Sequence, residues 1–514
     1  MRNDLPQHQK ALSVGTGMNG VKPRSALPKT TGMGFWRGGW ILYFLLAAAA
    51  GYFIAWQGLY FAYSLLSFVV LLLMAWKTKQ ALLALIFYLP LQFALNVSEN
   101  IDLSLIRVLI VALFLIWLAK SLAQKKLFIP NKLQTWLILV FGALSLLSVF
   151  FSIDESRSAI RALFFLSILP LYFVAADYLK PAASLGKVAV VILFSAAVVA
   201  LIGIIQFSAQ FVFGINEVIN FWSKNIAPIF YGHSFGALVL SYPSWLVNIS
   251  GQTYLRAISL FPDPHIFAFY LGLVAPLSLS LFLFSGLLSF PLRTKAALGV
   301  LNVILLLALF LTFSRAGYIG AIFGIGFLVV LSWKFLRGNT KIALGAIFAI
   351  FLLVMFSAPN LLLERFYSVF NFREGSNSER LANWKNAFKI IESAPLTGVG
   401  VGAYALALDA RSPERTPVSA HNTYLDIAAE MGIPAFLVWF ALLFASAKKL
   451  ISFSRAGAQS PLPFAFSLGM AGSLVWFSAQ SFFDTAIYSP TLLAMLMVYF
   501  AITVNIVKGH YQND

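Results

Sequence analysis

The stretch HNTYLD, His421–Asp426, begins a segment that continues through Glu430 and Gly432-Ile433-Pro434 into a long apolar run. An imidazole, an amide, a phenol and two carboxylates therefore lie close together in sequence, in a chain that has only five histidines. The apolar run that follows is long enough to cross a bilayer, which takes about 20 residues. The stretch thus predicts a polar site at the membrane edge of a helix, and the rest of the fold follows from placing that edge.

The composition predicts an all-α polytopic membrane protein. Hydrophobic residues make up 60% of the chain, charged residues make up 11%, and the mean hydropathy is +0.85. A chain with this fraction of hydrophobic residues has more apolar side chains than the core of a soluble protein can bury. We predict about 14 transmembrane helices, with 12 or 13 as alternatives, at a length of about 20 residues each. Their centres lie near Ala48, Ser67, Tyr88, Ala112, Phe141, Pro170, Ala196, Leu273, Leu305, Gly324, Phe351, Trp439, Ser473 and Met495.

The distribution of Lys and Arg predicts the orientation, because cytoplasmic connections carry the excess of positive charge. With both termini in the cytoplasm, the inner connections hold most of the basic residues and almost no acidic ones, whereas the outer connections are close to neutral. The formal net charge of +18 is then a sign of topology. It does not indicate a nucleic-acid partner, because such proteins present a basic patch on a soluble face.

This topology divides the chain into three parts. Residues 1–35 are predicted to be a disordered basic cytosolic tail, residues 36–508 a transmembrane helical domain, and residues 509–514 a cytosolic C-terminal tail. Two long periplasmic segments are expected, at about 211–262 and 359–432, and long loops in compact proteins are usually functional. The chain has no cysteine, which excludes disulfides and thiolate chemistry.

The second long segment contains a predicted helix. Ser376–Glu379 fits a capping box, Pro395 stops the helix, and an apolar face suggests that it lies along the membrane surface. Arg380 falls within that apolar arc. A side chain that snorkels to the interface and a guanidinium that faces an anion are equally consistent with this position. The predicted face consists of Leu381, Trp384, Phe388 and Ile391.

Arginine is the common cation at the outer helix ends. Arg157 and Arg161 share one face of a helix, Arg256 precedes the break Phe261–His265, and Arg315 lies in a turn with almost no loop. A single arginine at a helix end is usually an interfacial anchor. Several together favour a diphosphate ligand, because the planar guanidinium binds phosphate through two hydrogen bonds.

His421 needs a partner if it acts as a base, although a histidine at a helix start more often only caps the helix. If the segment is projected as a continuous helix, His421 lies with Leu425 and Ala428, and Asp426 points to the opposite side. This geometry disfavours Asp426. Asn422, Tyr424 and an outer arginine such as Arg315 remain candidates.

Four motifs resemble, in order, those of the O-antigen ligase and Wzy-type polymerase family of envelope polysaccharide enzymes, over roughly Ile258 to Trp439. They are Arg256 ahead of Phe261-x-x-Pro264, the run Ser314-Arg315-Ala316-Gly317, the run Arg380-Leu381-x-x-Trp384 with Pro395-Leu396-x-Gly398-x-Gly400, and His421-Asn422-x-Tyr424-Leu425 with Glu430-x-Gly432-x-Pro434. Ala435 departs from the pattern, since a glycine often follows the proline in relatives. The long tail and an extra helical hairpin also exceed the common core of the family.

The resemblance implies a GT-C-type glycosyltransferase of the bacterial inner membrane that acts on the periplasmic face without a metal or other cofactor. Its donor would be an undecaprenyl-diphosphate-linked polysaccharide, and its acceptor a lipid A core sugar or another lipid-linked glycan. Arg315 and His421 would be catalytic, with His421 as general base or as a donor to the diphosphate. The substrate-binding residues would be Arg256, Arg161, Arg157, Arg380, Asn422, Tyr424 and Glu430.

The choice between ligase and polymerase stays open, with a slight preference for an O-antigen ligase of lipopolysaccharide biosynthesis over a polymerase of O-antigen or exopolysaccharide. Two more distant alternatives are an acyltransferase, because His421 and Asp426 also fit an HX4D pattern, and a transporter of lipid-linked glycans. The helical projection argues against the first. The second would place charges near the membrane midplane and show repeated halves, which the chain does not.

Overall fold

The computed structural model describes residues 69–98, 101–180, 182–232, 243–249, 251–336, 338, 341, 375–412, 418–455 and 460–506. All of them belong to one compact unit, Ser67–Asp514. The predicted tails at 1–35 and 509–514 and the predicted spans near Ala48, Ser67 and Phe351 lie outside the described residues.

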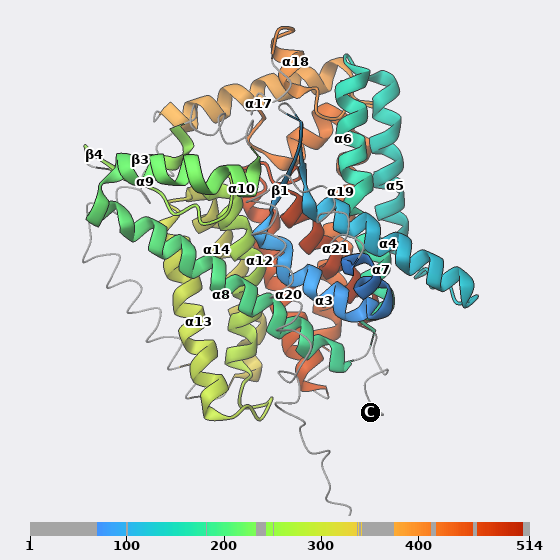
Figure 1. Ribbon diagram of the computed structural model, residues 1–514, viewed down its shortest axis with the longest axis vertical. Coiled ribbons are helices and arrows are strands. Elements are labelled where there is room, and N and C mark those ends of the chain that lie inside the picture. The colour runs from blue at the N-terminus through green and yellow to red at the C-terminus, as the bar shows by residue number, and fades with distance from the viewer. Residues whose placement is uncertain are drawn as a thin grey trace, which may run out of the picture. The chain divides into compact units, whose positions relative to one another are not determined.

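Helices dominate this unit (Figure 1). They are α3 (Thr78–Tyr88), α4 (Leu105–Ala123), α5 (Leu133–Leu147), α6 (Glu155–Ile168), α7 (Leu171–Tyr178), α8 (Ala182–Phe213), α9 (Ile215–Phe221), α10 (Ala227–Tyr231), α12 (Pro264–Leu283), α13 (Leu292–Leu311), α14 (Arg315–Ser332), α17 (Gly375–Ser393), α18 (Tyr404–Leu408), α19 (Thr423–Arg455), α20 (Pro461–Gln480) and α21 (Pro490–Asn505). The strands form two antiparallel hairpins, β1 (Ala94–Ser98) with β2 (Ile101–Ser104) and β3 (Leu246–Ile249) with β4 (Gln252–Leu255).

Nine helices within the described part of the chain are long and apolar enough to cross a membrane, and a tenth span is possible if the bent pair Val69–Trp76 and Thr78–Leu91 counts as one. Every predicted span that falls in the described residues coincides with a helix. Two of them depart from a simple span, because the one near Tyr88 is bent by 118° and the one near Met495 is the shorter helix Pro490–Asn505. The protein is therefore a multi-pass membrane protein.

The centre of the bundle is a trio of helices, α12, α14 and α20, which pack around the indole of Trp476. This side chain is fully buried, and a Cβ at Gly272, Gly320 or Gly324 would lie 2.2, 2.5 or 2.6 Å from its atoms. Glycine at these three positions lets the helices approach closely, as small residues do in membrane bundles. We refer to α12, α14 and α20 as the Trp476 trio.

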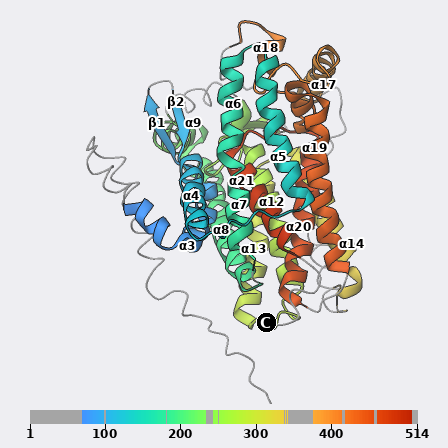
Figure 2. The same cartoon turned by 90° about the vertical axis from the view of Figure 1, so that its right-hand side faces the viewer.

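The connections predicted to be outer gather at one end of the unit, which is the upper end in Figures 1 and 2. Both hairpins, α9, α10, α17 and α18 lie there, and α17 runs across the bundle instead of along it. The connection between α12 and α13 lies at the opposite, lower end. The upper end thus collects the segments that carry the predicted site residues.

A break in α19 fixes one of these segments. Gly432 has a φ of 83°, which interrupts the helix one turn after Ala429. The loop 395–402 fills the interruption, because the freed carbonyls of Ala429 and Glu430 accept hydrogen bonds from Val399 N and Gly400 N, both at 3.0 Å, and Ile433 N donates to Pro395 O at 2.8 Å. Two motifs that are far apart in sequence therefore form one interlocked structure.

Candidate functional site

The site is centred on Asp484, a carboxylate in the short connection between α20 and α21. Its side chain is 3% exposed. One oxygen lies 3.1 Å from Arg380 Nη2 and 4.0 Å from His421 Nδ1, and the other lies 2.9 Å from His265 Nδ1. Asp484 thus joins residues from three separate regions of the chain.

His265 links this carboxylate to Arg256. Arg256 Nη1 lies 3.5 Å from His265 Nε2, and its Nε donates to Thr312 O at 2.7 Å. Because a guanidinium has no acceptor, this contact places the ring hydrogen of His265 on Nδ1, where it faces Asp484. Gln480 Nε2 also donates to the backbone carbonyl of His265 at 3.2 Å, and Gln480 itself accepts from Trp476 Nε1 at 3.0 Å. The Trp476 trio therefore holds the ring in place.

The turn between α13 and α14 brings Arg315 to the same region. Ser314 Oγ lies 3.2 Å from His265 Nδ1 and also caps α14 by accepting from Gly317 N. Phe313 adopts a φ of 48° and is buried against Val247 and Ile249 of the β3–β4 hairpin. A bulky residue in this region of φ costs about 1–3 kcal/mol, so the surrounding packing over-determines the turn. Arg315 follows directly and is buried at the first position of α14.

His421 lies in a loop. The expectation that it belongs to a continuous helix with Leu425 and Ala428 is therefore wrong. Helix α19 begins at Thr423, and Asn422 caps it, since its Oδ1 accepts from Tyr424 N at 3.0 Å and from Leu425 N at 3.1 Å. His421 has a φ of 49°. Its side chain is 45% exposed, so part of the ring is accessible from outside.

Two of the expected partners of His421, Asn422 and Tyr424, are engaged elsewhere. Asn422 serves as the cap, and Tyr424 OH donates to Ser478 O at 3.0 Å. Asp426 was correctly disfavoured as the partner, because it accepts from Ala420 N at 2.7 Å and from the hydroxyl of Thr485. Asp426 thereby anchors the backbone just before His421 to the connection that carries Asp484.

The electrostatics of the cluster favour an ionised carboxylate next to a neutral imidazole. Burial raises the pKa of Asp484, but the imidazole of His265 and the guanidinium of Arg380 lower it more strongly, to about 2. Burial lowers the pKa of His421 below its usual 6.5, the Asp484 charge opposes this, and the Arg380 charge adds to it. His421 is thus able to accept a proton at neutral pH.

The guanidinium of Arg380 faces the cluster, where it donates to the carboxylate of Asp484. Of the two positions expected from the sequence, the side chain therefore takes the one that faces an anion and not the one that snorkels to the interface. The predicted apolar face of α17 is divided between the protein and the surface. Leu381 and Phe388 are 40% and 54% exposed, whereas Ala387 and Ile390 are buried against the 395–404 segment and α19. The small side chain of Ala387 allows close contact there, and the large apolar residues remain on the outside.

The other predicted ligands contact the loop segments and not the Asp484 cluster. Arg157 is buried and its Nη2 donates to Ser412 O at 3.0 Å, while the Arg161 guanidinium lies 5.4 Å from the centre of the Tyr488 ring. Glu430 is buried; it accepts from Gly402 N at 2.9 Å, from Tyr404 N at 3.3 Å and from the hydroxyl of Tyr488. Through these contacts Glu430 and Arg157 hold residues 402–412.

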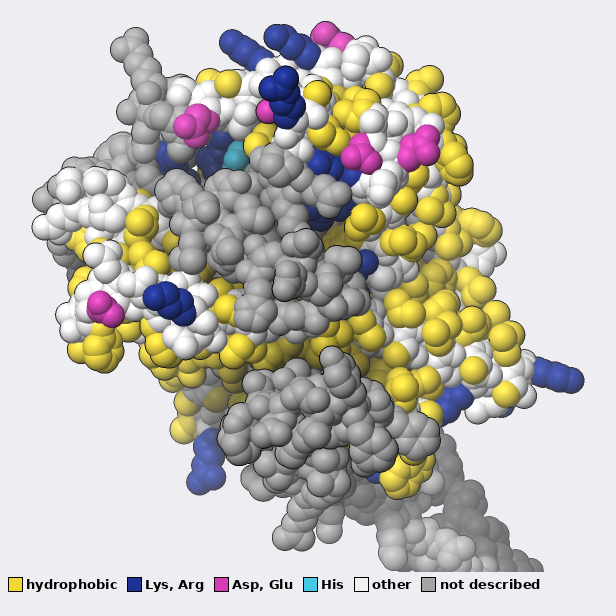
Figure 3. Space-filling view, turned by 45° about the horizontal axis from the view of Figure 1, so that its top comes forward, with side chains coloured by type: hydrophobic (Ala, Val, Ile, Leu, Met, Phe, Trp, Pro, Cys, Tyr) yellow, Lys and Arg dark blue, Asp and Glu magenta, His cyan; other side chains and the backbone are white. Residues whose placement is uncertain are grey.

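Sequence reasoning missed His265 and Asp484. His265 stands beside the proline break that the motif includes, and it is one of only five histidines. Asp484 follows Phe482-Phe483 in a short connection between two apolar helices, where an acidic residue is unusual. Figure 3 shows the upper end, where a histidine side chain is visible next to Lys and Arg side chains. Among the described residues, no group of three or more His, Asp or Glu is arranged to hold a metal ion.

The fold and this cluster define a class, namely a multi-pass membrane protein with a charged Asp–His–Arg site at one end of its helices. Residues 300–440 match the family model described as O-antigen ligase, a family of glycan-transferring enzymes. The resemblance inferred from the sequence is therefore confirmed over this range. The matched range contains Arg315, Arg380 and His421, whereas Arg256, His265 and Asp484 lie outside it. No curated protein matches the chain.

Proposed function

We propose that the protein transfers a polysaccharide from an undecaprenyl-diphosphate carrier to an acceptor sugar on the periplasmic side of the bacterial inner membrane. The observation that carries the proposal is the cluster around Asp484, which brings the half-exposed imidazole of His421 and the guanidinium of Arg380 to one carboxylate, in a chain whose residues 300–440 match the O-antigen ligase family model. A transferase of this kind needs a base for the acceptor hydroxyl and positive charge for the departing diphosphate.

We assign the roles of base and of charge neutralisation to residues of this cluster and its surroundings. With Nδ1 of His421 facing Asp484, Nε2 is the nitrogen that takes the proton from the acceptor hydroxyl. The acceptor oxygen then forms a bond to the anomeric carbon while the bond from that carbon to the diphosphate breaks. Arg315 and Arg256, with Arg380, neutralise the leaving diphosphate, and Asp484 stabilises the imidazolium that forms. Arg161 lies further along the same end and contacts the carrier or the glycan.

We favour a ligase that attaches O-antigen to lipid A core, with a Wzy-type polymerase as the second candidate. A deletion strain distinguishes the two. Loss of all O-antigen from lipid A core supports a ligase, whereas single repeat units that remain attached without long chains support a polymerase. A transporter would move the lipid-linked glycan in reconstituted vesicles without consuming it.

Replacement of His421 or Arg315 by alanine tests the assigned roles. We expect His421→Ala to lower the transfer rate about 10²–10⁴-fold, because the base is removed. We expect Arg315→Ala to lower it about 10²–10³-fold and Arg315→Lys to restore only part of it, because lysine keeps the charge without the planar fork. Transfer is measured with purified, reconstituted protein.

The matched control is Arg411→Ala, which removes an exposed arginine from the same end of the molecule. It should leave the rate unchanged. A near-normal rate for correctly inserted His421→Ala or Arg315→Ala protein would remove that residue from the mechanism.

The pH profile tests the state of His421. Since the base must be neutral and its pKa lies below 6.5, the rate should stay high at pH 6.5 and fall only at lower pH. Arg380→Gln removes a positive charge that disfavours protonation of the ring. This change raises the pKa of His421, so the acidic fall in rate should move to higher pH. A fall that stays in place, or moves to lower pH, contradicts the assignment of His421 as the base.

A further inference from the structure

A second feature lies at the lower end of the bundle, far along α14 and α19 from the Asp484 cluster. Both helices begin at the upper end and finish at the lower one, at Ser332 and Arg455. A cavity of about 270 Å³ lies between these two ends. It shares no residue with the site proposed above.

Two cations line this cavity, one from each side. Lys334 belongs to the short 3-10 turn η6 (Trp333–Phe335) that follows α14, and Arg455 is the last residue of α19. Among the described lining residues none is acidic. Two like charges at one cavity repel each other unless an anion lies between them.

The remaining walls are apolar and aromatic. Phe335 lines the cavity, and its ring packs edge-on against that of Phe464 in α20, with the ring centres 5.1 Å apart. Trp333 lines the cavity and is 51% exposed, as is typical of an indole at a membrane interface. An aqueous anion would gain little from such walls, whereas a headgroup joined to a hydrocarbon chain would gain from both parts of the cavity.

An apolar track leads from the cavity along the outside of α14. Phe323 and Val330 lie on one face of the helix and are 57% and 74% exposed. Gly326 lies between them on the same face, and a Cβ added there would meet no atom within 4 Å. The three residues follow the axis of α14, a helix long enough to cross the membrane, and this is the direction that an acyl chain takes in a bilayer.

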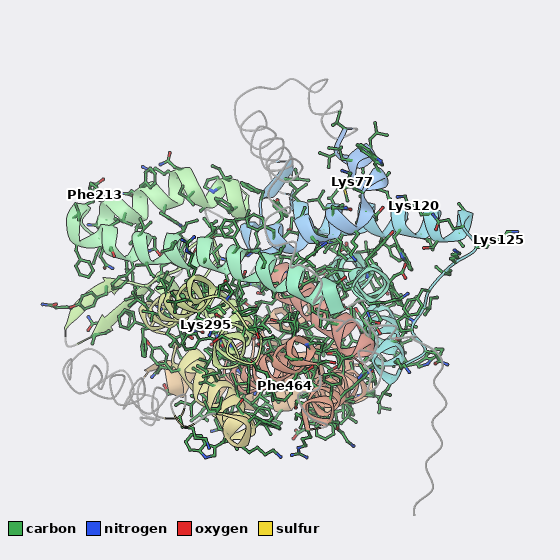
Figure 4. The ribbon with its side chains drawn as sticks, turned by 90° about the horizontal axis from the view of Figure 1, so that it is seen from below. Lys77, Lys120, Lys125, Phe213, Lys295 and Phe464 are labelled. Carbon is green, nitrogen blue, oxygen red and sulfur yellow. The ribbon has the colours of Figure 1, made fainter. Side chains whose placement is uncertain are left out.

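The lower end is also the basic end of the unit. Figure 4 shows it from below, with Lys77, Lys120 and Lys125 together on one side of the bundle and Lys295 and Phe464 nearer its middle. Basic connections face the cytoplasmic leaflet, which is the leaflet whose surface attracts positive charge. The charge of the cavity and the chemistry of that leaflet are therefore complementary.

We propose that this cavity binds an anionic glycerophospholipid of the cytoplasmic leaflet, with the phosphate between Lys334 and Arg455 and one acyl chain on the track formed by Phe323, Gly326 and Val330. The ligand is a structural lipid of the bundle and not a substrate. The proposal does not depend on the glycan transfer proposed above, because its measurement is lipid binding.

The test is a titration of the purified full chain in detergent with dioleoylphosphatidylglycerol, with bound lipid counted by native mass spectrometry. We expect one tightly held molecule. The charge-removing variant Lys334→Gln/Arg455→Gln should bind it about 30-fold more weakly, since each basic residue near an anionic lipid contributes about fivefold. Val330→Asn should weaken binding several-fold without altering charge. Arg293→Gln/Lys295→Gln, on the same end but outside the cavity, should bind normally.

Three outcomes overturn the proposal. Equal weakening in both double variants would mean that the lipid responds only to the general charge of this end. Equal binding of zwitterionic dioleoylphosphatidylcholine would remove the role of the two cations. Competition by inorganic phosphate at the lipid concentration would identify a site for a soluble anion. The substituted residues at the cavity are on the surface, so unchanged melting temperatures without lipid confirm that the variants are folded.

Discussion

Asp484→Asn should lower the transfer rate about 10²–10⁴-fold, which is among the largest effects expected of any single substitution in this protein. The change keeps the size of the side chain but removes the charge that holds His265 and Arg380 and faces His421. Loss of an orienting carboxylate in comparable His–Asp arrangements has effects of this order. The measurement is the transfer rate at saturating donor, with reconstituted protein of normal melting temperature.

A split between kinetic constants separates this role from a purely structural one. Without Asp484 the guanidinium of Arg380 keeps its full positive charge, so KM for the diphosphate-linked donor should not rise while kcat falls. Arg256→Ala should show the opposite tendency, with a raised donor KM. Asp409→Asn, an exposed carboxylate of the same end, is the control and should change neither constant. A rise of donor KM alone in Asp484→Asn contradicts the assigned role.

Gly432→Ala should destabilise the folded protein by about 3–5 kcal/mol. The residue has a φ of 83°, which costs about 1 kcal/mol for alanine, and its new Cβ would lie 2.3 Å from Leu396 O and 2.9 Å from Thr397 N. Those atoms are backbone of the loop 395–402, which is hydrogen-bonded into the break of α19 and has no room to retreat. A steric conflict of this kind belongs to the most destabilising class of point substitutions.

The matched control is Gly326→Ala, which adds the same methyl group within α14, where no atom lies within 4 Å of it. Alanine is the better helix former, so this variant should be as stable as the parent or slightly more stable. Thermal unfolding in detergent and the yield of folded protein provide the measurement. Equal stability of the two variants would show that the break at Gly432 is not required for packing of the loop.

The helices were predictable from the sequence because membrane spans are set by local apolar length. The arginines and His421 were predictable because they stand in short motifs. The centre of the site was not, since Asp484 meets its partners through contacts that join residues 63, 104 and 219 positions away, and only the packing of helices decides which helix ends become neighbours. Periodicity also placed His421 inside a helix, whereas α19 begins only after the cap Asn422. Within α17 it did not predict that Ala387 and Ile390 would be the buried residues.

The close packing of Trp476 against three glycines makes one part of the site more rigid than the other. His265 and Ser314 lie at the first turns of α12 and α14, which the indole packs against α20. Asp484 follows the end of α20, so these three groups are held rigidly relative to one another. Arg380 lies on α17, outside the Trp476 trio, and contacts this rigid group through Asp484. The Trp476 trio therefore fixes His265, Ser314 and Asp484 relative to one another, whereas the position of Arg380 depends on α17 and on its ion pair with Asp484.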